Sequence, residues 1–363
     1  MTPSPEGRPL HVLWLTSGLG CDGDSIAMTS ATNPSLEDLL RGSLPGIPPI
    51  VLCNPVLAFE SGEEFMRIWD EAAVGRLDPF VLVLEGSVPN EDVNGDGHWA
   101  GMGVDAATGQ PILTNEWIDR LTPRAAAVLA LGTCAAYGGV PAMRNNPTGA
   151  MGLRDYLGWE WQSQLGIPVV NLPGCPVQPD NITQTLLRLA LQLAGLAPPI
   201  DLDEQGRPVE FFDRTVHERC DRAGFADQAQ FSEQLGDGRC LVKLGCSGPA
   251  ARCNVPMRGW VNGVGGCPNV GGICTACTMP GFPDRFMPFM EPDAGARLYA
   301  RTARFGHGPF VRYMRNRRMR RIFAPCRRIR SARRWGILRF NFSATVCRLM
   351  RCRGMTATIW AGR

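Results

Sequence analysis

The sequence predicts an α/β protein with a flavodoxin-like parallel sheet in its N-terminal domain, followed by an irregular, Cys-rich C-terminal domain. Residues 10–200 alternate short apolar runs with amphipathic stretches, as the strands and crossover helices of a parallel sheet do. This periodicity weakens after Pro198-Pro199, and seven cysteines follow between Cys220 and Cys277. We therefore expect three parts: a sheet domain at 1–198, a Cys-rich domain at 199–293 and an Arg-rich tail at 294–363.

The elements of the sheet domain are predicted from hydrophobic pattern and capping residues. Four apolar runs have the length of buried strands: 11–16, 80–85, 126–131 and 168–172. The amphipathic stretches predict helices at 35–41, 63–73, 116–121 and 181–193. Ser35, Asn115 and Asp180 are of residue types that cap helices, and we predict that they do so here.

The composition indicates a folded chain that uses cysteine for something other than disulfides. Of its 363 residues, 44% are hydrophobic and 20% are charged, which is ordinary for a globular protein. A chain of this length can bury a sufficient core without disulfides, and its 14 cysteines lack the spacing of a small secreted framework. We therefore expect most of them to bind metal.

Two segments bear on location. Residues 1–10 contain neither a twin-arginine pair nor an apolar signal core. The uncharged stretch 125–143 is interrupted by glycines and by Pro141, which favours strand and turn over a membrane helix. We expect no transmembrane span and a cytoplasmic location, with peripheral membrane association as an option.

The last 70 residues differ from the rest in charge. Residues 294–363 hold 19 of the 37 basic residues, all of them Arg, and none of the 34 acidic ones. Such a segment could bind nucleic acid, acidic lipid or an acidic protein surface. Its composition is also what an altered reading frame in GC-rich DNA would encode, so we assign it no role and expect no nucleic-acid partner.

Three cysteines lie just beyond predicted strands: Cys21, Cys134 and Cys175. The carboxyl ends of parallel strands meet at one edge of the sheet, so these thiols can converge although they are far apart in sequence. Flanking Gly and Pro residues let the backbone approach a bulky cofactor and leave amides free to donate to sulfur. The alternative is that each is a buried cysteine acting as a small hydrophobic residue.

The loop of Cys21 also contains a G-x-G-x-x-G pattern at Gly18, Gly20 and Gly23, which is the fingerprint of a dinucleotide site. The acidic residue expected about 20 positions further on would be Asp38, but it lies inside a predicted helix. Pro34 breaks the helix that the loop should open. The pattern is therefore weak evidence for a nucleotide.

Two further sets of metal-binding side chains follow in the C-terminal domain. The first combines one imidazole with three thiols: His217, Cys220, Cys240 and Cys246. The second has four thiols and ends in a C-x-x-C pair: Cys253, Cys267, Cys274 and Cys277. Either set suffices for one four-iron cluster or for a zinc ion, and zinc stays an alternative.

In their order, these motifs resemble the small subunit of nickel–iron hydrogenases. The series is the Cys21 loop, EGS at Glu85, GTCAAYGG, PGCP, HERC, GCSGP, and CTAC before PGFPD, over about Leu10 to Pro292. The resemblance implies three [4Fe-4S] clusters: a proximal one in the sheet domain, then a medial and a distal one in the C-terminal domain. Hydrogen would be split in a separate large subunit that holds the nickel–iron centre, so this chain would carry no catalytic residue.

The resemblance also implies which residues bind each cluster. The proximal ligands would be Cys21, Cys134 and Cys175, to which we add Asp24 as our own prediction. The medial ligands would be Cys253, Cys274 and Cys277, to which we add Cys267 as our own prediction. The distal ligands would be His217, Cys220, Cys240 and Cys246, where a neutral imidazole in place of a thiolate raises the potential.

Two positions depart from the usual pattern of the family. The proximal motif is usually C-x-x-C, but here Asp24 occupies the fourth position, and we predict a carboxylate ligand that alters the potential. The alternative is that Asp24 caps the following turn. Many relatives have three medial cysteines, and Cys267 adds a fourth, so we predict a four-iron medial cluster; the alternative is an unligated thiol. Both departures resemble the high-affinity, oxygen-insensitive uptake hydrogenases.

The predicted function is therefore an electron-transfer subunit that passes electrons to an acceptor, for which a quinone-linked one is an option, in a dimer of heterodimers or a larger assembly. One alternative is the cluster-bearing quinone-coupling subunit of respiratory complex I, and another is a zinc-stabilised nucleic-acid-binding module. Cys53 is predicted to be a core residue, and Cys326, Cys347 and Cys352 have no assigned role. Glu85 and His98 could lie near a subunit interface or a proton path, although lone polar loop residues are usually just solvated.

Overall fold

A computed structural model of the chain describes residues 9–44, 46–95, 98–105 and 107–286, all of which belong to one compact unit. The Arg-rich tail predicted at 294–363 lies outside the described residues, and so do its three cysteines. The predicted boundary between 198 and 199 stays a prediction.

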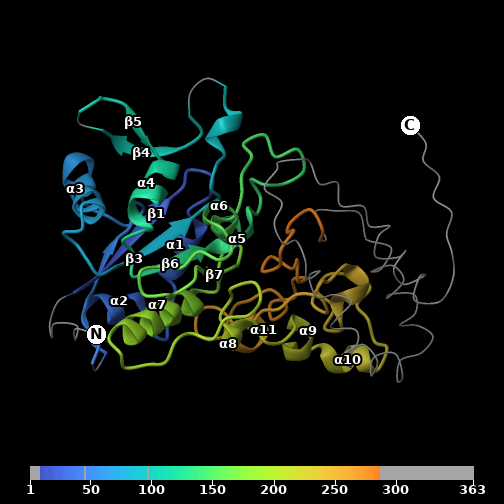
Figure 1. Cartoon of the computed structure of the whole chain (residues 1–363). Helices are drawn as coiled ribbons and strands as arrows, with labels where there is room; N and C mark the ends of the chain where they lie inside the picture. Colours follow the sequence, from blue (N-terminus) through green and yellow to red (C-terminus); the bar gives the residue numbers. More distant parts are fainter. Residues whose placement is uncertain (1–8, 45, 96–97, 106, 287–363) are drawn as a thin grey trace, which may run out of the picture. The chain divides into compact units, whose positions relative to one another are not determined.

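A five-stranded parallel sheet forms the centre of the N-terminal region (Figure 1). The strands are β1 (Leu10–Thr16), β2 (Ile50–Cys53), β3 (Phe80–Glu85), β6 (Ala127–Leu131) and β7 (Val170–Leu172). They pair in parallel in the order β2-β1-β3-β6-β7. This is the strand order of flavodoxin-like folds, so the predicted fold class is confirmed.

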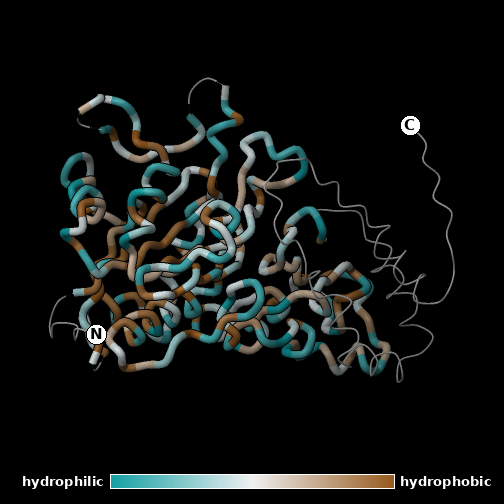
Figure 2. Tube along the Cα trace, viewed as in Figure 1, coloured by the Kyte–Doolittle hydropathy of each residue, from teal (hydrophilic) through white to brown (hydrophobic). Residues whose placement is uncertain are grey.

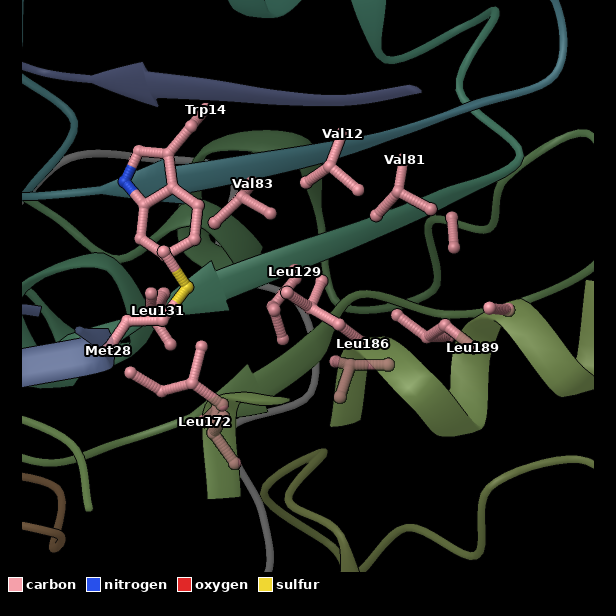
Figure 3. Close-up of a cluster of buried hydrophobic side chains, with 14 of the residues drawn as sticks. Val12, Trp14, Met28, Val81, Val83, Leu129, Leu131, Leu172, Leu186 and Leu189 are labelled. Atoms are coloured by element: carbon pink, nitrogen blue, oxygen red, sulfur yellow. The ribbon is translucent and has the colours of Figure 1, made fainter. Parts of the chain in front are cut away.

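Both faces of the sheet are buried, because successive side chains of a strand point to opposite sides and helices cover both. On one face, Trp14 and Leu129 pack with Met28 of α1 (Gly23–Met28) and Leu186 of α7 (Pro179–Leu193) (Figure 3). The opposite face packs against α3 (Gly62–Ala73) and α4 (Thr114–Leu121), and its core includes Cys53, as predicted. Figure 2 shows hydrophobic residues concentrated along the strands of the interior.

The longer elements correspond to the predicted ones, whereas several short elements have no counterpart among the predictions. The four predicted strands are β1, β3, β6 and β7, and the four predicted helices are α2 (Leu36–Leu40), α3, α4 and α7. Not predicted are β2, α1, the hairpin of β4 (Gly101–Val104) and β5 (Pro111–Leu113), α5 (Gly132–Tyr137), α6 (Leu153–Leu157) and the 3-10 turn Glu91–Val93.

One of the three predicted helix caps is confirmed. Ser35 caps α2, since its Oγ accepts from the amide of Asp38 over 3.2 Å and the Asp38 carboxylate accepts from the Ser35 amide in return. The prediction for Asn115 is wrong, because β5 leads directly into α4 and leaves Leu113 at the N-cap. The prediction for Asp180 is also wrong, because Pro179 starts α7 one residue earlier and Gln178 is the cap.

After α7 the described chain contains only short elements, in agreement with the predicted irregular architecture. These are α8 (Val209–Phe212), α9 (Val216–Arg219), α10 (Ala223–Asp227), a 3-10 turn (Leu241–Leu244) and α11 (Val255–Arg258). Their small core contains Cys274, with Cys246 and Cys253 packed against it. None of the helices in the described ranges has the length and apolar character needed to cross a bilayer.

Polar contacts join this region to the sheet domain. Arg258 Nε donates to the buried Asp180 carboxylate over 3.0 Å. The Gln178 side chain donates to the Gly259 carbonyl over 2.9 Å. Arg207, also buried, donates to the Thr278 carbonyl over 3.2 Å, one residue beyond Cys277. The Cys-rich segment is therefore held against the start of α7.

Candidate cluster-binding sites

The predicted proximal residues come together at the carboxyl edge of the sheet. Cys21 follows β1, Cys134 lies in α5 directly after β6, and Cys175 follows β7. A Cβ added to Gly23 would lie 3.0 Å from the Cys21 sulfur and 3.6 Å from Cβ of Pro176, so the first loop abuts the Cys175-Pro176 turn. Desolvation, followed by the charges of Cys134, Asp24 and Cys21, raises the pKa of Cys175 to about 11.

Asp24 lies among these thiols with its carboxyl group buried in the first turn of α1. Its Oδ1 accepts from the amide of Val177, a residue remote in sequence, over 2.7 Å. A Cβ on Gly132 would overlap the carboxylate. Burial, reinforced by the charge of Glu85, raises the pKa of Asp24 to about 8, although the Val177 bond opposes this. A positive charge close to Asp24 would stabilise the ionised form of its buried carboxyl group.

The side chain of Glu85 holds the backbone of Asp24 through a hydrogen bond. Glu85 ends β3, is buried, and accepts from the Asp24 amide over 2.8 Å and from Trp14 Nε1 over 2.8 Å. Ser25 Oγ donates to the same carboxylate over 2.5 Å and accepts from the Asn54 amide over 2.9 Å. Glu85 therefore lies in a buried network beside the proximal residues, and its place near a subunit interface or a proton path stays a prediction. His98 is exposed.

All four predicted distal residues line one pocket in the C-terminal region. Its walls include His217, Cys220, Cys240 and Cys246, together with Arg222 and the apolar Val216, Leu241, Pro249 and Pro268. Desolvation is the main cause that raises the pKa of Cys240, to about 11, and the charges of Cys246 and Cys220 add to it. Three thiols and one imidazole therefore face a common space.

The four predicted medial thiols form a third group. Burial raises the pKa of Cys253 to about 11, with a contribution from the charge of Cys267. Burial also raises the pKa of Cys277, and here too the neighbouring charges are those of Cys253 and Cys267. Burial, followed by the charge of Cys246 and then by those of Cys277 and Cys253, raises the pKa of Cys274. The C-x-x-C pair and the two preceding thiols thus share one neighbourhood.

Two contacts connect the three groups in series. The Cys274 amide donates to the Cys246 sulfur over 3.3 Å, which joins the medial group to the distal group. The hydroxyl of Thr133, the residue before Cys134, donates to the Cys277 carbonyl, which joins the proximal group to the medial group. The medial group therefore lies between the other two.

The spacing of these donors bears on the zinc alternative. In the described ranges, no three His, Cys, Asp or Glu side chains are arranged to hold a single metal ion. Zinc would need its sulfur ligands within about 4 Å of one another, because Zn–S bonds are about 2.3 Å long. In a four-iron cluster each ligand binds a different iron, so its ligands need not lie as close together as those of one zinc ion.

Comparisons with known proteins agree with this arrangement. Residues 212–290 match the family model for the C-terminal part of the NiFe/NiFeSe hydrogenase small subunit, and residues 21–189 match NADH ubiquinone oxidoreductase, 20 Kd subunit. The periplasmic [NiFeSe] hydrogenase small subunit of Desulfomicrobium baculatum is 32% identical over 294 residues, which cover 80% of this chain and 89% of that protein. The structure of the actinobacterial-type NiFe-hydrogenase from Ralstonia eutropha H16 is 55% identical, with a TM-score of 0.80, and the match covers 93% of this chain and 97% of that chain.

Fold, thiol groups and comparisons define the chain as a subunit of an oxidoreductase that acts on hydrogen. It belongs to the small-subunit family of nickel–iron hydrogenases. The match over 21–189 covers only the domain that this family shares with the complex I protein, whereas the match over 212–290 is specific to hydrogenases. The complex I alternative therefore has no separate support.

Proposed function

We propose that the chain relays electrons from hydrogen oxidation in a nickel–iron large subunit through three [4Fe-4S] clusters to an acceptor. The observation that carries this proposal is the serial contact of the three thiol groups, through Thr133 with Cys277 and through Cys274 with Cys246. Each group adjoins the next, as a relay of short steps requires.

At the proximal site, we propose that Cys21, Cys134 and Cys175 supply thiolates and Asp24 supplies a carboxylate. The clusters, when bound, supply the redox chemistry. The protein holds the ligands: the Val177 amide fixes one oxygen of Asp24, and Glu85 fixes its backbone. This support comes from β3 and the β7 loop, so the carboxylate is held by the fold and not only by its own helix.

At the medial site, four thiolates would bind the cluster, including Cys267. The support is that Cys267 lies within electrostatic range of both Cys253 and Cys277. At the distal site, His217 would replace one thiolate and reduce the negative charge of the cluster, which raises its potential. An electron would then move toward this end of the series.

The partner would be the large subunit, and the exposed Cys21 and Cys175 mark where it can approach the proximal site. We further propose membership of the high-affinity, oxygen-insensitive uptake group, because Asp24 and Cys267 stand at the two positions that depart from the usual pattern of the family. A cytoplasmic location, a quinone-linked acceptor and a dimer of heterodimers or larger assembly stay proposals. The Desulfomicrobium baculatum relative is named periplasmic, so location needs its own measurement.

The test is the metal content of the complex purified without oxygen. We expect about twelve iron atoms and as many acid-labile sulfides in clusters per heterodimer, since three four-iron clusters are proposed, with nickel and one further iron in the partner. Zinc with little iron would overturn the relay and favour a structural metal module.

A further inference from the structure

Arg219, the last residue of α9, is a buried cation next to the medial region. Its side chain is only 8% exposed and pairs with Asp213. One terminal nitrogen donates to the Phe211 carbonyl over 2.9 Å. Its Nε, however, is buried and has no hydrogen-bond partner. Buried polar groups are almost always bonded, so this N–H requires an explanation.

The position of Arg219 associates it with a medial thiol. Helix α9 packs against α11, which begins two residues after Cys253. A β-bridge between Thr215 and Arg252 holds the two segments together just before these helices. Arg252, the residue before Cys253, donates to the Asp213 carbonyl over 2.7 Å, and Arg219 pairs with the carboxylate of the same residue.

We propose that Arg219 tunes the potential of the medial cluster. Its buried positive charge stabilises the reduced, more negative state of the group held by Cys253, Cys267, Cys274 and Cys277. Its Nε–H is free to donate to a sulfur of that group. This inference rests on the proposed function, because it requires a cluster at the medial site. Arg219 acts here as a positioning residue and does not ligate iron.

The positive charge of Arg219 and the negative charge of Asp213 should not cancel at the medial thiols. Cluster potentials depend on local charge, hydrogen bonds to sulfur and solvent exposure. Asp213 opposes the charge of Arg219, but its side chain is 38% exposed and it also pairs with Arg214 over 3.4 Å. Water therefore screens the carboxylate more than the buried guanidinium. The medial thiols should feel the positive charge more strongly than the negative one.

The test is a redox titration of the loaded heterodimer, followed by electron paramagnetic resonance of the medial signal. At the wild-type midpoint, Arg219→Gln should lower the ratio of reduced to oxidised medial cluster about tenfold, which is a downward shift of about 59 mV for one electron. Arg219→Lys keeps the charge and should restore most of the ratio. The proximal signal should move less.

Arg214→Gln is the matched control. It removes the same charge from the same segment and the same partner, but the Arg214 side chain is 64% exposed. We expect less than a twofold change in the medial ratio. Equal changes in the two glutamine variants, or no change in Arg219→Gln with full iron content, would overturn the proposal.

A second variant decides the question if Arg219→Gln fails to assemble. Asp213→Asn retains Arg219 and removes its counter-charge, so the reduced fraction of the medial cluster should rise; a constant or lower fraction would overturn the proposal. If the wild-type heterodimer carries no medial signal and too little iron, the proposed function fails instead. The two failures are therefore distinguishable.

Discussion

The backbone amide of Asp24 donates to Oε1 of Glu85 over 2.8 Å and so joins the first turn of α1 to the end of β3. The other oxygen of Glu85 accepts from Trp14 Nε1 and Ser25 Oγ. One buried carboxylate thus satisfies donors from three residues, and the backbone position of Asp24 depends on it.

Glu85→Gln should destabilise the protein by about 1–3 kcal/mol, because the new amide NH₂ would face donors and leave at least one of them unsatisfied. Thermal or denaturant unfolding of the heterodimer measures this change. Glu116→Gln is the control: its side chain is 45% exposed and pairs with Arg120 on the surface of α4, so a change below about 0.5 kcal/mol is expected. Equal effects would contradict the role of Glu85.

Asp24→Cys should change both the spectrum and the potential of the proximal cluster. Thiolate sulfur is a softer and more covalent ligand for iron than carboxylate oxygen, so the potential should depart from that of the wild type. Asp22→Asn is the control, because it removes a neighbouring charge and Asn tolerates the positive φ of 54° at this N-cap. If the Asp24→Cys spectrum and potential equal those of the wild type, Asp24 is not a ligand.

Gly132→Ala should disrupt the proximal site. Gly132 has φ +82°, and a Cβ there would overlap the Asp24 carboxylate. Gly195→Ala is the matched control, with φ +73° and no atom within 4 Å of the added Cβ. Each alanine should cost about 1–2 kcal/mol from backbone strain, and Gly132→Ala about 1–3 kcal/mol more from the overlap. Unfolding and the proximal signal test this; equal losses would mean that Gly132 has no special relation to Asp24.

Cys267→Ala should remove about one iron per chain and convert the medial cluster to a three-iron form, because each ligand holds one iron of the cluster. Iron analysis and the paramagnetic resonance of the oxidised protein report this. Cys53→Ala removes a core thiol on the far side of the sheet. It should leave the iron content unchanged and cost about 1 kcal/mol of stability. A full medial cluster in Cys267→Ala would show that this thiol is not a ligand.

Asp180 should make the stability of the chain depend on pH. Burial alone would raise its pKa, but the amides of Thr32 and Asn33, the Gln178 side chain and the charge of Arg258 hold the pKa below its usual range. A carboxyl group with a lowered folded pKa stabilises the protein above its unfolded pKa and loses this effect as pH falls through the folded value.

The variant Asp180→Asn tests this dependence. It should be about 1–3 kcal/mol less stable than the wild type at pH 7. The difference should shrink below about pH 4, where the unfolded carboxyl begins to take up its proton. Denaturant unfolding at several pH values measures both. A difference that is constant with pH would show that the Asp180 carboxylate is not the source.

The sheet was predictable because its strands are buried on both faces and therefore form continuous apolar runs, such as β3 and β6. Ser35 was predictable as a cap because its partner Asp38 is three residues away. The caps of α4 and α7 depend on how the chain enters each helix, which local composition does not specify. Short helices such as α1 and α5 contain Gly and have too few turns for a periodic signal.

The grouping of the thiols could be anticipated from strand ends and from the C-x-x-C pair, but their supports could not. The donors to Glu85 are separated from it by 60, 61 and 71 positions in the sequence. No short-range sequence pattern links positions that far apart. The same holds for Asp180, whose partner Arg258 is 78 positions away. Arg219 lies between two predicted ligands, His217 and Cys220, yet only its burial and its unpaired Nε single it out.

Cys274 lies in the small hydrophobic core after α7, and Cys246 and Cys253 pack against it. The cysteines proposed to bind the electron-carrying clusters are therefore also part of the core that keeps this region folded. A chain that fails to acquire its clusters should unfold first in the Cys-rich region after α7, since metal-dependent regions unfold without their metal. Proteases cleave opened segments in proportion to how often they open. A small subunit without its clusters would then be degraded before it could displace a working one from its large subunit.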